Sequence, residues 1–208
     1  MQPMRAVRLF LCLFALTVAL TLVGCIPSPT SQDRLPHASP PTDHNTTSPE
    51  STQTPALDRK ANPVRLLIPA IGVHALIEKV GVTPGGDLAV PTQNPWEDVG
   101  WYRSGPYPGE RGSAVIDGHL DRPGGYPAVF WHLRDLQVGN EVTVVDSHGK
   151  AFHFHVTGIV FYAPQDAPIQ QIFANNSGTY LNLITCAGDW IPGQHQTTLR
   201  LVVYTSLD

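Results

Sequence analysis

The chain has 208 residues and a formal net charge of −4, and only 14% of its residues are charged. Lys and Arg total 13 against 17 Asp and Glu, which excludes the strongly basic surface that nucleic-acid binding requires. The 42% content of hydrophobic residues is enough for a core, and the last 146 residues, 63–208, suit one ordinary domain.

The N-terminus is typical of an export signal. Two arginines precede the apolar run of residues 9–23, whose 15 residues are shorter than the roughly 20 needed to span a membrane as a helix. The run ends in Leu22-Val23-Gly24-Cys25, which resembles the bacterial lipobox. The resemblance implies a signal peptide over residues 1–24, cleavage before Cys25, and a lipid on the Cys25 sulfur. The alternative is an uncleaved signal anchor.

Residues 25–62 are predicted to be a disordered linker. Pro, Ser and Thr fill 18 of the 37 positions from 26 to 62, and large apolar residues are almost absent. Such a segment cannot bury enough surface to fold by itself. We therefore expect a tether that holds residues 63–208 outside the cytoplasm, anchored to the outer face of the membrane.

Strand patterns dominate residues 63–208, and the pattern of residues 141–162 is that of a hairpin with its turn at 147–150. Helical pattern is weak and limited to a turn or two within 128–136 and 169–174. Many short strands and 18 glycines in the chain predict an all-β fold, a closed or nearly closed barrel. The predicted strands, in chain order, are 64–68, 75–82, 114–116, 141–146, 151–162, 180–185 and 197–204.

Cys186 is the only cysteine after residue 25. An unpaired thiol is unusual in an exported domain, because oxidising compartments favour disulfides. It follows the predicted strand 180–185, and residues 187–189 resemble a loop, so the sulfur is expected at a strand end on the barrel rim. A thiol attacks as thiolate and needs a neighbouring base or cation. The alternative is a buried, inert thiol.

His119 and Arg200 are the candidate partners of this thiol. His119 follows a short apolar strand and Gly118, which permits a sharp turn that projects the ring from the rim. Arg200 is the only charged residue in the predicted strand 197–204, so it faces either solvent or a functional cleft. Arg103 and Arg122 are weaker candidates for the same role.

A zinc site is the enzymatic alternative. His153 and His155 are two residues apart on one predicted strand, so both rings share a face, and His119 with Asp121 would complete a ligand set. Exposed strand histidines explain the same pattern, and no metal or cofactor is expected.

Three motifs in a fixed order make residues 63–208 resemble the sortase family, and most of all its class F. The resemblance begins at Arg65-Leu66-Leu67-Ile68-Pro69 and continues through Val99-Gly100-Trp101-Tyr102 and residues 108–112. The motifs are Gly118-His119-Leu120-Asp121, Leu183-Ile184-Thr185-Cys186 and Arg200-Leu201-Val202-Val203.

The resemblance implies an eight-stranded sortase-type β-barrel with short helical turns, and it implies a role for each motif residue. Cys186 would be the nucleophile, His119 the general acid and base, and Arg200 the stabiliser of the oxyanion. The implied reaction is transpeptidation. Cys186 would cleave a C-terminal, LPXTG-like sorting signal of a surface protein through a thioester, and an amine on a cell-wall precursor or pilin would then accept the acyl group.

The resemblance also leaves open points. Thr185, Trp190 and Asp121 are candidates for the substrate groove, and the four tryptophans are otherwise expected in the core. Asp117 stands where a small neutral residue is expected, and its charge would raise the pKa of His119. A monomer is expected. The alternatives are a zinc-dependent cell-wall hydrolase and a non-catalytic, lipid-tethered β-domain.

Overall fold

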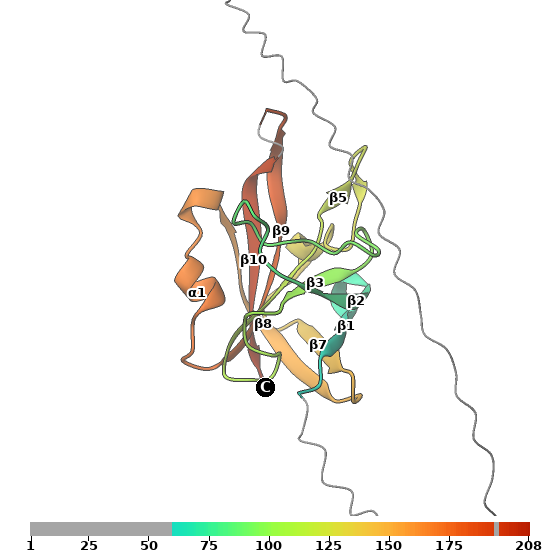
Figure 1. Cartoon of the computed structure of the whole chain (residues 1–208), viewed down its shortest axis with the longest axis vertical. Helices are drawn as coiled ribbons and strands as arrows, with labels where there is room; N and C mark the ends of the chain where they lie inside the picture. Colours follow the sequence, from blue (N-terminus) through green and yellow to red (C-terminus); the bar gives the residue numbers. More distant parts are fainter. Residues whose placement is uncertain (1–59, 194–195) are drawn as a thin grey trace, which may run out of the picture. The chain divides into compact units, whose positions relative to one another are not determined.

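Eight strands close into a β-barrel in the computed structural model, which describes residues 60–193 and 196–208 (Figure 1). The predicted signal peptide, Cys25 and the linker up to residue 59 lie outside the described residues. The predicted all-β, closed eight-stranded barrel is confirmed. In order around the barrel the strands are β1 (Pro63–Ile68), β2 (Val73–Val80), β3 (Val99–Tyr102), β4 (Gly112–Asp117), β9 (Thr179–Ile191), β10 (Gln196–Leu207), β8 (Ala151–Tyr162) and β7 (Glu141–Asp146).

The remaining elements are short and lie in the connections between strands. A two-stranded hairpin follows β4, and three 3-10 turns and one α-helix complete the described part of the chain. Their bounds are β5 (Asp121–Arg122), β6 (Tyr126–Pro127), η1 (Pro69–Ile71), η2 (Leu133–Asp135), η3 (Pro164–Asp166) and α1 (Ile169–Phe173).

Side chains alternate between the two faces of each strand, and the inward-facing ones form the core. In β9, Leu181, Leu183 and Ala187 face the barrel interior and belong to the main apolar cluster, whereas Ile184 belongs to a smaller cluster on the outer face. Successive residues of a strand point to opposite faces, so Cys186 lies on the same outer face as Ile184. The interior is closed by large side chains, among them Trp101, Phe130 and Phe154, all nearly inaccessible to solvent.

The outer cluster packs beneath α1, which lies beside the long strands β9 and β10 (Figure 1). Val115 of β4, Ile172 of α1 and Val202 of β10 are its buried members. Asn182 of β9 donates a buried hydrogen bond from its side-chain amide to the Ile172 carbonyl, at 2.6 Å. This contact holds the connection between β8 and β9 against the outer face that carries Cys186.

Two sequence predictions differ from the structure. Strand β3 was not predicted, because four residues are too few to show a period. The segment 187–189, expected to be a loop, is instead part of β9, which runs on to Ile191. Gly188 at φ 76° and a register shift between Thr197 and Leu199 accommodate the irregularity within the paired strands. Cys186 therefore lies within a strand and not at its end.

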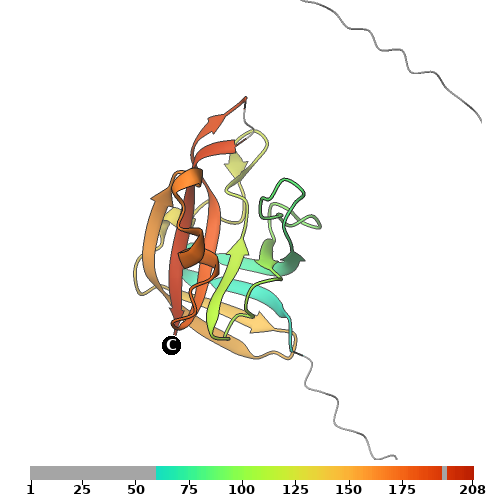
Figure 2. The ribbon, with the colours of Figure 1, turned by 60° about the vertical axis from the view of Figure 1, so that its left-hand side comes forward.

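The ends of β9 and β10 extend beyond the rest of the barrel (Figure 2). The β5–β6 hairpin lies toward the same end in Figure 1, and the β7–β8 turn lies toward the other. The residues that the structure describes contain no helix long and apolar enough to cross a membrane.

Candidate active site

The register of neighbouring strands leads the candidate base towards the strand of the candidate nucleophile. Strand β4 runs parallel to β9, and its last residue, Asp117, is paired with Ile184. The pairing continues one residue further, since the Gly118 N–H donates to the Ile184 carbonyl at 3.2 Å. His119 comes two residues after Asp117, as Cys186 comes two residues after Ile184 on β9. His119 and Cys186 are both half-buried, which leaves each ring or thiol partly accessible.

Arg200 lies on the other side of Cys186. Strand β10 is antiparallel to β9, and Arg200 is directly opposite Cys186 in the register. Directly opposite residues of a sheet project to the same face, so the guanidinium and the thiol share the outer face. Nη1 of Arg200 donates to the Thr197 carbonyl at 3.2 Å, to the Thr197 hydroxyl at 3.0 Å and to the Leu199 carbonyl at 3.0 Å. Within residues 60–193 and 196–208, the hydrogen bonds of the Arg200 side chain all come from Nη1.

Thr185 braces this arrangement from inside the barrel. Its side chain is buried, and its hydroxyl donates to the Gly118 carbonyl at 2.8 Å. The bond joins the residue before Cys186 to the residue before His119. Thr185 therefore lies on the interior face of β9, next to Cys186 in the chain but turned away from the outer face. Its assignment to the substrate groove stays a prediction.

The environment of His119 lowers its pKa. Burial is the main cause, because it disfavours the charged imidazolium, and the Asp121 carboxylate opposes this effect. The ring of Trp96 lies against the imidazole, with centroids 4.9 Å apart and planes at 45°. Trp96 was expected in the core, and no motif pointed to this contact. The one sequence feature that could have drawn attention to Trp96 is the Asn94-Pro95 turn directly before it, ahead of β3.

Asp117 does not raise the pKa of His119 as expected from the sequence. Its side chain is 7% exposed, and its Oδ1 has no hydrogen-bond partner among the described residues. Burial raises the pKa of Asp117 to about 8, so the carboxyl is mostly neutral at pH 7. Asp121, exposed at the start of β5, is the carboxylate that acts on His119.

The two weaker arginine candidates lie elsewhere. Nη2 of Arg122 forms a salt bridge with Glu97 at 3.2 Å, and its Nε donates to the Pro127 carbonyl at 2.9 Å. Arg103 is exposed and its side chain lies over Gly81. Trp190, on β9 beyond Cys186, is 57% exposed and therefore not a core tryptophan.

The histidines of the zinc hypothesis are not gathered. Nδ1 of His153 is 2.9 Å from the Glu141 carboxylate, and His155 pairs with Asp208. His153 and His155 are both exposed on β8, whereas His119 follows β4. In the described part of the chain no three His, Cys, Asp or Glu residues lie together as a metal site would require.

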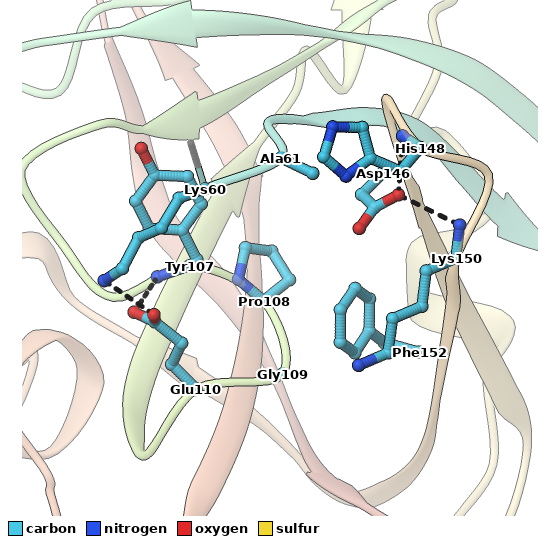
Figure 3. Close-up of a pocket in the computed structure, with 10 residues that line it drawn as sticks. All are labelled: Lys60, Ala61, Tyr107, Pro108, Gly109, Glu110, Asp146, His148, Lys150 and Phe152. Carbon is cyan, nitrogen blue, oxygen red and sulfur yellow. Dashed lines mark hydrogen bonds and ion pairs between the residues drawn. The ribbon is translucent and has the colours of Figure 1, made fainter. Parts of the chain in front are cut away.

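A cavity of about 320 Å³ lies at the other end of the barrel, between the β7–β8 turn and the loop before β4 (Figure 3). Its two carboxylates, Glu110 and Asp146, are already bound within the chain. Lys60 pairs with Glu110 at 2.6 Å, and one Asp146 oxygen accepts the His148 and Lys150 N–H groups at 2.8 and 2.9 Å. It contains none of Cys186, His119 and Arg200.

In the described part of the chain, Cys186 is a free thiol on a closed eight-stranded barrel, with Arg200 directly opposite it in the register. The family model of the sortase domain matches residues 66–208. The chain therefore belongs to the sortase family, and its general class is that of the sortase transpeptidases. No curated protein matches the chain.

Solved sortases share the fold at low sequence identity. Sortase A from Corynebacterium diphtheriae, in a lid mutant, is 18% identical with a TM-score of 0.55, over 70% of this chain and 69% of that one. A Clostridium perfringens sortase D5 transpeptidase is 22% identical with a TM-score of 0.52, over 71% and 79%. Sortase C-1 from Actinomyces oris is 22% identical with a TM-score of 0.55, over 71% and 75%.

Proposed function

We propose that this sortase is a cysteine transpeptidase that cleaves an LPXTG-like sorting signal through a thioester on Cys186. The observation that supports the proposal is the strand register: Arg200 on β10 is directly opposite Cys186, and β4, which pairs with β9 on its other side, ends two residues before His119. A nucleophile, a proton carrier and a fixed positive charge on one face are the parts that acyl transfer from an amide requires.

In the first half of the reaction, the Cys186 thiolate attacks the carbonyl carbon of the signal's Thr residue. The carbonyl oxygen becomes an oxyanion, which the Arg200 guanidinium stabilises because it stays charged at any relevant pH. The C–N bond then breaks, and protonated His119 gives its proton to the departing amine. The product is a thioester between the Thr carbonyl and Sγ of Cys186.

In the second half, an acceptor amine attacks the thioester. Neutral His119 takes a proton from the amine, the C–S bond breaks, and Cys186 leaves as thiolate. The lowered pKa of His119 favours the neutral base in this step and makes the imidazolium a stronger acid in the first. One ring therefore serves both halves.

The motifs of residues 118–121, 183–186 and 200–203 support placing the enzyme in class F. The N-terminal pattern supports an extracytoplasmic location, with a lipid on Cys25 as the anchor to the outer face of the membrane and residues 25–62 as the tether of the domain 63–208. The partners are then surface proteins with a C-terminal sorting signal and an amine on a peptidoglycan precursor or pilin. The enzyme acts as a monomer.

Mass spectrometry of the enzyme after exposure to a library of sorting-signal peptides tests this function. An acyl adduct on Cys186 is expected, and its sequence identifies the signal. The Cys186→Ala variant must carry no adduct. The absence of any adduct across the library, with a folded and alkylatable enzyme, would contradict the proposal.

Arg200→Ala tests the oxyanion role. The rate of peptide cleavage should fall on the order of 10²–10³-fold while the melting temperature changes little. Arg122→Ala is the matched control, since the Arg122 guanidinium is already bound to the Glu97 carboxylate and to the Pro127 carbonyl. Equal rates in the two variants would mean that another donor holds the oxyanion.

A further inference from the structure

A tryptophan outside the family motifs is in direct contact with His119. The Trp96 and His119 rings lie 4.9 Å apart between centroids, at an interplanar angle of 45°. Both side chains are half-buried. The contact therefore covers part of the imidazole and leaves part of it accessible.

The turn that carries Trp96 is tied to the barrel on its β2 side. The buried Asp98 accepts the Leu76 N–H at 3.2 Å with Oδ1 and the Asn94 side-chain amide at 3.0 Å with Oδ2. The Asp98 N–H donates in turn to the Asn94 carbonyl at 2.9 Å. The turn is thus closed upon itself and joined to β2, so that the indole has little freedom to move away from the imidazole.

The same turn is also joined to the segment that holds the backbone of His119. The Val129 N–H donates to the Trp96 carbonyl at 2.8 Å, and the next residue, Phe130, donates its N–H to the His119 carbonyl at 3.0 Å. Two consecutive backbone donors therefore hold Trp96 and His119 at a fixed separation. Phe130 is fully buried in the core, which anchors this brace.

The charged surroundings of His119 come from four segments. Asp121 follows it and raises its pKa, while Asp117 precedes it and is mostly neutral at pH 7. Cys186 on β9 and Arg200 on β10 are directly opposite each other, and β4, which ends two residues before His119, pairs with β9. Burial outweighs Asp121 and lowers the pKa of His119. The indole contributes to that burial, because it covers a ring face that water would otherwise solvate.

We propose that Trp96 is a positioning residue for His119. In this role Trp96 holds the imidazole beside Cys186 and shields one part of the imidazole from water. The proposal rests on the proposed function, in which His119 carries protons to and from the scissile amide. A base whose ring packs against an aromatic side chain keeps its orientation before each proton transfer. A displacement of the base near 1 Å can lower the rate about 10²-fold. Trp96 itself supplies no nucleophile, acid or base to the reaction.

The experiment compares Trp96→Leu with Trp131→Leu in the purified enzyme. Trp131 is an equally half-buried tryptophan, but its ring meets the Arg134 guanidinium at 5.9 Å instead of His119. The readouts are kcat and KM for a peptide that forms the Cys186 adduct, and the pKa of His119 from NMR titration of a labelled imidazole. Should Trp96→Leu not fold, Trp96→Met replaces it, because Met keeps much of the volume but has no ring face.

We expect kcat to fall about 10-fold to 10²-fold in the Trp96 variant, with KM little changed. The pKa of His119 should rise towards its ordinary value of 6.5, since part of the burial is removed. Trp131→Leu should change neither quantity. An unchanged kcat together with an unchanged pKa of His119 in the Trp96 variant overturns the inference.

The inference and the proposed function fail in different ways. If Cys186→Ala still turns over peptide, the proposed function is wrong, whereas the titration of His119 continues to report whether Trp96 shields it. If Cys186→Ala is inactive and Trp96→Leu behaves like Trp131→Leu, the function stands and the positioning role is wrong.

Discussion

The buried carboxyl of Asp117 should make the stability of this domain depend on pH in an unusual direction. Its Oδ1 lacks a partner in the described part of the chain and lies over Gly100, where a Cβ would be only 2.4 Å away. Burial raises its pKa from 3.8 to about 8, whereas the unfolded chain keeps the ordinary value. Between these two values the folded domain binds a proton that the unfolded chain has lost.

The sign and size of the effect follow from proton linkage. A group that binds more protons in the folded state destabilises that state as pH rises, by about 1.4 kcal/mol for each pH unit. The contribution of Asp117 to stability is therefore complete below pH 3.8 and is lost as pH rises towards about 8. The cost is about 4 kcal/mol at pH 7 relative to a group that does not ionise.

Asp117→Asn removes this dependence, because the amide is isosteric with the neutral acid. The free energy of unfolding, measured by urea titration with tryptophan fluorescence, should be compared with wild type from pH 5 to pH 8. The variant's advantage should grow by about 4 kcal/mol over that range. Asp166→Asn, at an exposed carboxylate, controls for the loss of one charge. A difference between variant and wild type that stays constant with pH would refute the reasoning.

Two further pairs of variants, each a test with its control, probe buried contacts of the domain. Thr185→Val and Thr205→Val each remove a buried Thr hydroxyl bond to a backbone carbonyl, so both should lower the free energy of unfolding by about 1–3 kcal/mol. Only Thr185→Val should also lower kcat, and an equal loss of kcat in both would contradict the bracing role. Gly100→Ala should destabilise by about 1–3 kcal/mol, because the added methyl meets the Asp117 carboxyl. Gly193→Ala, where no atom lies within 4 Å, should change stability little, and equal melting temperatures would disprove the crowding at Gly100.

Local pattern was enough for most strands and for the types of residue that carry the chemistry. Strands β7 and β8 and their turn appear where alternation and turn residues predicted them, because a period of two and a Gly-containing turn are local properties. The motifs around His119, Cys186 and Arg200 predicted the sortase family, which the family match over residues 66–208 confirms. Strand β3 was not predicted, because a strand of four residues, one of them Gly100, shows no period.

Only the tertiary structure decided what surrounds Cys186. The pairing of β9 with β4 joins segments far apart in the chain, and such register depends on the whole barrel instead of any local pattern. The same holds for the continuation of β9 through residues 187–189, the contact of Trp96 with His119 and the burial of Asp117. The sequence by itself determined that this chain has a histidine, a cysteine and an arginine in three motifs that resemble those of sortases. The strand pairing placed Cys186 and Arg200 directly opposite each other, because the register, and not sequence spacing, sets which side chains become neighbours.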